Sequence, residues 1–472
     1  MKKTKTIPSR KPTKPSSSVA EALQVLNPNA AGIDVGSASH YVCVAPHAVG
    51  AGQSRIREFG AFTHQLDGLV QWLKQCKVQT VVMESTGIYW IPLFQKLETG
   101  GIQTLLVNAR DVRHLPGRKT DMKDCEWLQR LHTYGLLRGS FRPADGICRM
   151  RSVMRHRANL VSSAAQQVQL MQKALQQMNI LLHLVVSDLD GQTGLRILDA
   201  IVAGQRDPKE LVKLRDERIK KSTPEEMEAA LEGDWRPEHL FALRQSLNAY
   251  RFFQEQLDEC DLHLKETMEQ VIVEMNLSAS QAPQPEGDSR PTRKIKRKRV
   301  FGNAPKIDLS QHLRTLAGLD LTQTMGISTL SALVLISEVG IDMSRWRNEK
   351  AFAAWMGLAP DHKISGGRIL SNRTRPVINR AATILRLMAL ATGKTDTVLG
   401  HFYRRIRARS GAPKAITATA RKLACLVYHL IKHKEPYIEP ELAGYLQRFE
   451  KQRLTNLARQ ARTLGYQLVP AT

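Results

Sequence analysis

The sequence predicts an α/β domain near the N-terminus, followed by a long and mainly helical remainder. Two observations predict this division. Short β-branched runs alternate with amphipathic segments as far as residue 145, which is typical of an α/β sheet domain. From residue 153 to 182 an apolar residue then returns at intervals close to a heptad, which is typical of a helix packed on a partner helix.

Each element of the α/β domain follows from its local pattern. Strands are expected over residues 31–44 (with a turn at Gly36), 55–62, 80–83 and 102–107. Helices are expected over residues 66–75, 88–97 and 121–134, the second of them opened by Ser85 or Thr86 as N-cap.

The rest of the chain is expected to be helical. The heptad-like seam contains Val153, Leu160, Ala164, Val168, Met171, Leu175, Met178 and Leu182. Phe252, Leu257 and Leu264 are candidates for a returning helix, so that an antiparallel coiled coil and an ordinary helical bundle both remain open. Residues 313–341 favour two helices joined by a glycine-containing turn, which is either a helix-hairpin-helix or a packed helical hairpin.

The predicted segments are a disordered basic tail (1–27), the α/β domain (28–145), a helical coiled-coil region (146–277), a basic linker (278–306), a mainly α domain (307–440) and a C-terminal helical tail (441–472). The linker carries six basic residues among the seven at 293–299, which suits either a solvated tether or a strand that lies along phosphates.

The formal net charge is +25, and a protein this basic usually meets a polyanion, by default a nucleic acid. Residues 301–472 hold 26 Lys and Arg against 11 Asp and Glu, so most phosphate contacts are expected there. No apolar targeting segment or membrane span is expected, and six scattered cysteines without a C-x-x-C pair favour a reducing cytoplasm over a disulfide framework or a zinc site.

Four carboxylates form a candidate metal site. Asp34 lies between apolar Ile33 and Val35, Glu84 ends the run TVVME, and Asp121 and Asp124 lie one helical turn apart. Two strand ends and one helix face can bring these groups together, and carboxylate oxygens suit Mg²⁺ or Mn²⁺. Taken singly, each residue could instead be an ordinary turn residue or a helix-terminal charge.

The motifs GIDVG, MESTGIYW and KTDMKDCEWL, in this order, resemble the N-terminal domain of DEDD transposases of the IS110 insertion-sequence family. MGLAPDHKISGGRILSNRTRPVINRAA and FYRRIRARSGAPKAITATARKLACLVYHL resemble the C-terminal domain of that family. The resemblance covers about residues 30–438. It implies an RNase H-like (RuvC-like) fold for the first domain and a DNA transposase or site-specific recombinase activity.

The resemblance also implies roles for single residues. Asp34, Glu84, Asp121 and Asp124 fall on the metal-binding DEDD positions, and Ser365 falls on a serine nucleophile that forms a covalent link to DNA. A serine needs activation to attack, which Lys363 and Arg368 would assist by stabilising charge at the phosphorus. The expected nucleic-acid contacts are Lys363, Gly366, Gly367, Arg368, Arg373, Arg375, Arg404, Arg405, Arg407, Arg409, Lys414, Arg421 and Lys422.

The implied partners are donor and target DNA, a structured guide (bridge) RNA encoded by the element, and further copies of the chain in a dimer or tetramer. The serine and the carboxylates are implied to meet in a composite site from different protomers. Two other functions stay open on the residues alone. One is a metal-dependent junction-resolving nuclease without serine chemistry, and the other is a non-catalytic scaffold that binds nucleic acid.

Overall fold

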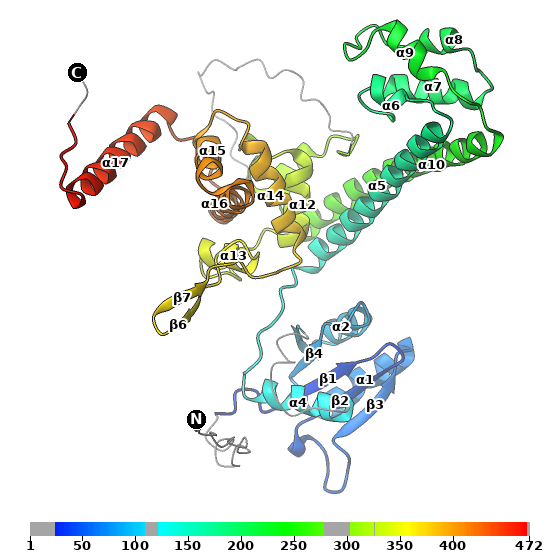
Figure 1. Ribbon diagram of the computed structural model, residues 1–472. Helices are drawn as coiled ribbons and strands as arrows, with labels where there is room; N and C mark the ends of the chain where they lie inside the picture. Colours follow the sequence, from blue (N-terminus) through cyan, green and yellow to red (C-terminus); the bar gives the residue numbers. More distant parts are fainter. Residues whose placement is uncertain (1–23, 109–120, 278–302, 325, 470–472) are drawn as a thin grey trace, which may run out of the picture. The chain divides into compact units, whose positions relative to one another are not determined.

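A computed structural model describes residues 24–108, 121–277, 303–324 and 326–469 (Figure 1). Its contacts divide the chain into two compact units, Met1–Arg142 and Pro143–Thr472. The predicted tail lies almost wholly outside the described residues, as does the basic run at 293–299.

The first unit is built on one mixed sheet, which confirms the α/β prediction. Its strand order is β3-β2-β1-β4-β5, with β1 antiparallel to β2 and parallel to β4. The strands are β1 (Ala30–Val35), β2 (Ser39–Cys43), β3 (Ile56–Gly60), β4 (Thr80–Glu84) and β5 (Gln103–Val107). The run at 31–44 forms two strands joined by a turn at Gly36, whose amide donates to the Ser39 carbonyl at 3.0 Å.

Helices cover both faces of this sheet. α1 (Thr63–Gln75) and α2 (Trp90–Thr99) share one apolar core with Ile33 and Met83, while α4 (Asp121–Thr133) shares a second core with Val82. Because successive strand residues point to opposite faces, the sequence alternation already separates the two cores.

One detail of the first unit was predicted wrongly. α2 begins at Trp90 after Tyr89, which makes no side-chain cap, so neither Ser85 nor Thr86 is the N-cap. The Ser85 hydroxyl donates instead to the Val107 carbonyl at 3.0 Å, and the Thr86 hydroxyl donates to Glu84 Oε1 at 3.2 Å. Both side chains therefore stabilise the end of β4 rather than the start of the helix.

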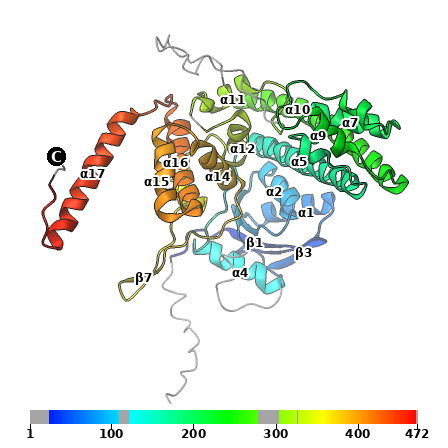
Figure 2. The ribbon, with the colours of Figure 1, turned by 45° about the horizontal axis from the view of Figure 1, so that its top comes forward.

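The second unit begins with two long helices, α5 (Asp145–Gln177) and α10 (Pro237–Glu274), which lie side by side (Figures 1 and 2). They run antiparallel, since Arg149 pairs with Glu274 and Arg157 with Asp261. A regular coiled coil stays a prediction.

Leu182 of the predicted seam lies elsewhere than expected. It is buried in a separate short helix and not on the long one, because α5 ends at Gln177. The returning helix is α10, which contains Phe252, Leu257 and Leu264. Leu257 and Leu264 are buried, whereas 54% of Phe252 is exposed.

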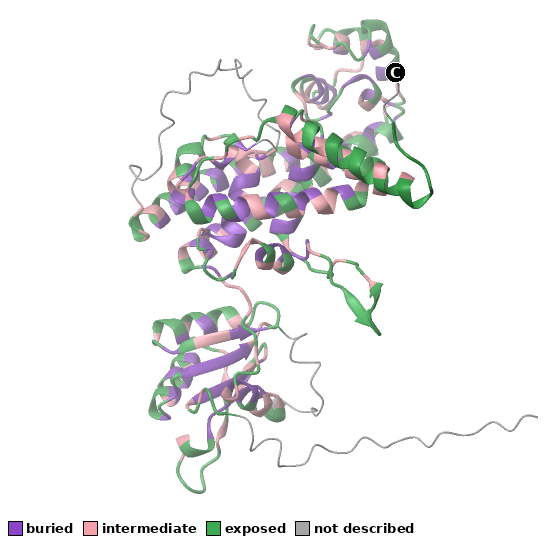
Figure 3. Ribbon diagram, turned by 90° about the vertical axis from the view of Figure 1, so that its left-hand side faces the viewer, coloured by how far each residue is buried: buried purple, intermediate pink, exposed green. Residues whose placement is uncertain are grey.

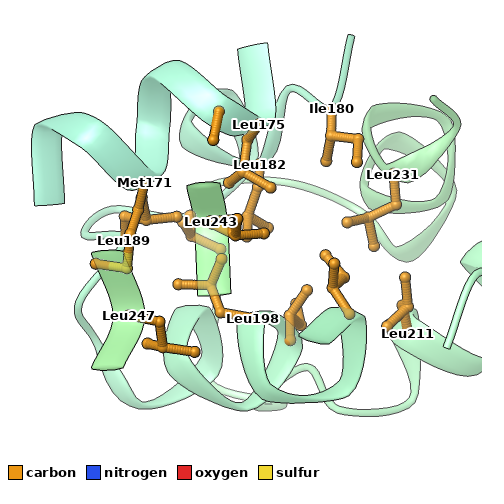
Figure 4. Close-up of a cluster of buried hydrophobic side chains, with 14 of the residues drawn as sticks. Met171, Leu175, Ile180, Leu182, Leu189, Leu198, Leu211, Leu231, Leu243 and Leu247 are labelled. Atoms are coloured by element: carbon orange, nitrogen blue, oxygen red, sulfur yellow. The ribbon is translucent and has the colours of Figure 1, made fainter. Parts of the chain in front are cut away.

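A small helical cap at the far end of the helix pair was not predicted as a separate core. It comprises α6 (Leu182–Val185), α7 (Gln192–Val202), α8 (Pro208–Val212) and α9 (Pro224–Leu231). Figure 4 shows Met171 and Leu243 of the long helices packed in the same cluster as Leu198 of the cap. This core holds the two long helices together at that end.

The other end of the helix pair meets a set of shorter elements. These are α11 (Ser310–Ala317), the 3-10 turn η4 (Leu321–Gln323), α12 (Thr329–Val339), α13 (Glu349–Trp355), β6 (Lys363–Ser365), β7 (Arg368–Ser371), α14 (Arg380–Thr392), α15 (Val398–Ser410), α16 (Ala412–His433) and α17 (Leu442–Thr463). The mainly helical character is thus confirmed, with a β6–β7 hairpin that was not predicted. A helix-hairpin-helix over α11 and α12 stays a prediction.

Ion pairs join these shorter helices to the long pair, and in them Arg157, Asp261 and Glu338 are buried while Arg155 is exposed. Arg157 bonds Asp261 at 2.5 Å and the Asn303 carbonyl at 2.8 Å, and Arg155 of α5 bonds Glu338 of α12 at 2.8 Å. A buried charge is tolerated only with such partners, so these contacts fix the start of the C-terminal region on the helix pair.

Within the described residues, no helix is long and apolar enough to span a membrane. All six cysteines are described, and none forms a disulfide.

Candidate functional site

Asp34 and Glu84 lie side by side at the ends of two neighbouring strands. The parallel register of β1 and β4 pairs Ile33 with Met83, so the next residues along, Asp34 and Glu84, continue that pairing. Hydrogen-bonded strands are about 4.8 Å apart. Both carboxylates point away from the core that contains Ile33 and Met83, and hence toward the face covered by α4. Two half-buried carboxylates this close repel each other unless a cation lies between them.

The helix α4 is held directly against β1 by an unusually close approach. A Cβ on Gly32 would lie 2.4 Å from the Cys125 carbonyl oxygen and 2.3 Å from the Gln129 nitrogen, so only glycine fits there. Farther along the helix, buried His132 Nε2 lies 2.9 Å from the Thr80 hydroxyl. These contacts fix the part of α4 that follows the expected DEDD aspartates.

Gly32, Gln129 and His132 were not among the predicted site residues. A glycine inside a strand is the only local signal for such a contact, because it marks a close approach of another segment without naming it.

The fourfold carboxylate set is only partly described. Asp124 is half-buried one turn into α4, on the helix that covers Asp34 and Glu84. Asp121 begins the helix, but its side chain is not among those that the structure describes. Among the described side chains, no group of three His, Cys, Asp or Glu lies close enough to hold a metal ion. The fold thus aligns two carboxylates and places a third on the covering helix, without a closed cluster.

The negative charge of Asp34 acts on the thiol of Cys125 in α4. The pKa of the Cys125 thiol is raised first by its hydrogen bond with Cys43, next by burial, and further by the negative charges around it, that of Asp34 included. Gly32, two residues before Asp34 on the same face of β1, lies against the Cys125 carbonyl, so Asp34 lies near the first turns of the helix. The opening turns of α4 and the end of β1 therefore share one electrostatic environment.

Ser365 lies in a different setting, at the end of the β6–β7 hairpin. The turn is Gly366-Gly367, with φ of 54° and 76°, which is the left-handed pair that a two-residue hairpin requires. A Cβ at either glycine would meet nothing within 4 Å, so the backbone conformation and not crowding calls for glycine here.

Arg368 is the direct cross-strand neighbour of Ser365. The tip residues are exposed, including Ile364 and Ile369, which pair with each other across the hairpin (Figure 3). Arg368 therefore lies where its guanidinium can reach a phosphate held at the serine hydroxyl.

The expected nucleic-acid contacts fall into three places. Lys363, Gly366, Gly367 and Arg368 lie in the hairpin, with Arg373 and Arg375 just after it; Arg404, Arg405, Arg407 and Arg409 lie on α15; and Lys414, Arg421 and Lys422 lie on α16.

Two of these arginines also serve the fold. The Arg404 guanidinium donates to the carbonyls of Gly393 and Thr395, at 3.2 and 2.7 Å, and so closes the end of α14. Arg405 lies over the ring of Phe449, with its guanidinium carbon 4.3 Å from the ring centre.

Comparison with known families concerns both the carboxylate-bearing sheet and the Ser365 hairpin. Residues 31–180 match the model of DEDD transposases of IS110, and residues 310–404 match the model described as Transposase IS116/IS110/IS902 family. The chain belongs to the IS110 family of transposases. No curated protein matches it.

As a member of this family the protein is a DNA transposase, an enzyme that acts on DNA strands. The first match contains the carboxylate-bearing sheet, and the second contains the hairpin with Ser365. The carboxylates predicted from the sequence therefore lie in the first unit of this IS110 transposase, and Ser365 lies in the second.

Proposed function

We propose that this IS110 transposase cleaves and rejoins DNA strands with two sets of residues, the carboxylates on the sheet and Ser365 on the hairpin. The observation that carries the proposal is the alignment of Asp34 and Glu84 on adjacent parallel strands under α4. Ser365 supplies the nucleophile, and its hydroxyl oxygen forms a bond to a DNA phosphorus as the bond to a deoxyribose oxygen breaks.

The donor set suits a divalent metal. Asp34, Glu84 and Asp124 offer only carboxylate oxygens, and hard oxygen donors favour Mg²⁺ or Mn²⁺ over softer metals. With Asp121, which begins α4, the set has four carboxylates. When bound, the metal would neutralise negative charge on the phosphate.

The chain's own residues carry the rest of the step. Ser365 loses its proton as it attacks, and the departing deoxyribose oxygen gains one, so that strand cleavage conserves charge overall. Arg368, opposite Ser365, holds a nonbridging phosphate oxygen. In the second step the freed hydroxyl of another strand attacks the phosphoserine, which releases Ser365 and joins the strands.

Target choice is proposed to come from a guide RNA encoded by the element, and the catalytic halves from different copies of the chain in a dimer or tetramer. The excess of Lys and Arg after residue 300 supports binding of a large polyanion. The presence of the carboxylates and Ser365 in two separately folded units supports assembly of the site from two parts.

The test uses supercoiled donor and target plasmids, the element RNA and Mg²⁺. Asp34→Ala and Ser365→Ala are each expected to lower recombination by about a hundredfold or more, because each removes a group that acts on the reacting phosphate. Ser371→Ala, in the other strand of the same hairpin, serves as the matched control and is expected to recombine like the parent.

The proposal fails if Asp34→Ala and Ser365→Ala both recombine at the parent rate. Loss of activity in Asp34→Ala alone would favour the junction-resolving nuclease. Nucleic-acid binding that is unchanged when all divalent metal is removed, with no recombination by the parent protein, would favour the non-catalytic scaffold.

A further inference from the structure

A groove of about 1100 Å³ lies in the second unit, along the helix α16. Lys414, Arg421, Cys425 and His429 line it at intervals of seven and four residues, so one face of α16 forms its floor. Val398, Leu399 and Phe402 of α15 form one wall.

The stem of the serine hairpin forms another wall of the groove. Pro360 and Thr374 line the groove and form the β-bridge that closes this stem. The Asp361 amide donates to the Arg373 carbonyl at 2.9 Å beside them, and Arg373 also lines the groove. A strand bound in the groove would therefore be continuous with whatever lies on the hairpin.

The ionisable groups of the groove are strongly unbalanced. Among the residues that the structure describes, five cationic side chains line it, and Glu349 is the one carboxylate. The five are Lys350, Arg373, Lys414, Arg421 and Lys422. His429 lies 3.9 Å from Glu349 and offsets part of that negative charge when protonated. The groove is thus complementary to a polyanion.

The wall beneath these cations is apolar. Phe402 is approached by Lys422 Nζ, 4.8 Å from its ring centre, and by the Arg405 guanidinium carbon at 5.4 Å. Tyr437 also lines the groove, and its hydroxyl donates to Glu439 at 2.8 Å, while Glu439 accepts the Val398 amide at 3.1 Å. Through Glu439, Tyr437 is held against the first turn of α15.

This combination fits an unpaired strand better than a duplex. A duplex offers phosphates to a protein surface but keeps the faces of its bases stacked, so an apolar wall would gain nothing from it. A single strand can place phosphates on the cations and unstacked bases against aromatic rings.

We infer that this groove binds the single-stranded DNA that flanks the phosphate attacked by Ser365. The inference rests on the proposed function, because the serine hairpin forms one wall of the groove and serine attack is on DNA. The phosphates lie along Lys414 and Arg421, and a base packs against Phe402.

The test measures binding by fluorescence anisotropy, without Mg²⁺, of the full-length protein to labelled oligothymidylate, oligouridylate and a DNA duplex. Ala418 lines the groove, and Ala418→Trp fills the space without changing charge. Oligothymidylate affinity is expected to fall about tenfold in this variant and in Phe402→Leu, with duplex affinity little changed.

Charge is tested separately with Lys414→Gln/Arg421→Gln, which is expected to weaken binding of oligothymidylate about tenfold or more and to flatten its salt dependence. The exposed Arg453 on α17 lies outside the groove lining, and Arg453→Gln serves as the charge-matched control, expected to bind nearly like the parent. Because Lys414 is exposed, Lys414→Gln tests the groove even if Ala418→Trp fails to fold.

A bromodeoxyuridine-substituted oligonucleotide, crosslinked by ultraviolet light, should mark a peptide containing Phe402 or Tyr437. The inference is overturned if the groove variants bind oligothymidylate like the parent, if Arg453→Gln weakens binding as much as they do, or if only oligouridylate binding falls, which would assign the groove to RNA. The binding assay involves no cleavage of DNA. If Ser365→Ala recombined at the parent rate, the proposed function would be refuted, but the binding results for the groove variants would still stand.

Discussion

Asp34 and Glu84 lie on two interior strands of a five-stranded sheet, beneath a helix that packs so closely that only Gly32 fits. Ser365 lies at the tip of a two-stranded hairpin whose residues are exposed. The first setting fixes its groups to within the precision of a packed core. The second fixes only the turn that follows the serine. We propose that the carboxylates are preformed in part, whereas the serine is placed by its substrate.

The largest effect is expected when the negative charge of Glu84, beside Asp34, is removed. Glu84→Gln should lower recombination by about a hundredfold or more, because it removes a carboxylate from the proposed metal site. Without metal the variant should be at least as stable as the parent, since the repulsion with Asp34 is relieved. Thermal unfolding checks this: Mg²⁺ should raise the parent's melting temperature more than the variant's, and an equal rise in both would contradict it.

The packing beside Asp34 and Glu84 is tested by Gly32→Ala. The added methyl would meet the backbone of α4 at 2.3 to 2.4 Å, so the helix must shift. A loss of about 2 kcal/mol in unfolding free energy is expected from this overpacking. Gly68→Ala, on α1 where a Cβ would meet nothing within 4 Å, is the matched control and should be neutral or stabilising by up to about 1 kcal/mol. Similar losses in both would show that α4 is not held as described.

A substitution in the exposed Ser365 hairpin should lower activity and leave stability nearly unchanged. Gly367 has φ of 76°, which a β-carbon makes costly, so Gly367→Ala should distort the turn and lower recombination about tenfold. The melting temperature should hardly change, because the hairpin tip packs against nothing within reach of that Cβ. Gly367→Asn, which tolerates the left-handed region, should retain more activity than Gly367→Ala. A large loss of stability would contradict the contrast between the carboxylate-bearing sheet and the hairpin.

The smallest effect concerns pH. Burial lowers the pKa of His132 below its usual 6.5, so the folded state favours the neutral ring that faces Thr80. The unfolded chain then binds more protons below about pH 6.5, and the stability contributed by this neutral ring is lost as pH falls through that value. The protection free energy of the α4 amides, taken from hydrogen exchange after correction for the intrinsic exchange rate at each pH, should therefore fall on acidification, by on the order of 1 kcal/mol per pH unit.

His132→Gln is the comparison variant, since it removes the titrating ring from the same position. The acid sensitivity of α4 should be smaller in His132→Gln, although buried His40, whose pKa burial also lowers, retains some of it for the first unit. Equal acid sensitivity in the parent and the variant would assign the effect to other groups.

The strands that carry Asp34 and Glu84 were largely predictable from the sequence, whereas the hairpin that carries Ser365 was not. The apolar residues on either side of Asp34 gave its strand and the face to which it points, and the continuous apolar run before Glu84 gave the second strand, because both patterns are local. Ser365 was singled out through a resemblance, but its hairpin escaped prediction, since β6 and β7 are short and their Ile364–Ile369 pair covers no core.

Contacts distant in sequence escaped prediction for a different reason. The fit of Gly32 under α4 and the Arg157–Asp261 pair depend on segments 97 and 104 residues away in the chain, Gln129 and Asp261 respectively, and no local pattern encodes such partners. The cap over α6 to α9 was hidden because each helix is short and amphipathic on its own.

The central claim is that Ser365 becomes covalently joined to DNA with help from the carboxylates of the first unit. The direct measurement is a denaturing gel of end-labelled donor DNA incubated with protein, element RNA and Mg²⁺, followed by peptide mapping of any retained label. The account predicts a protein–DNA adduct on the peptide containing Ser365, present in Ser371→Ala and lost in both Ser365→Ala and Asp34→Ala. Cleaved DNA without an adduct, or an adduct that persists in Ser365→Ala, would contradict it.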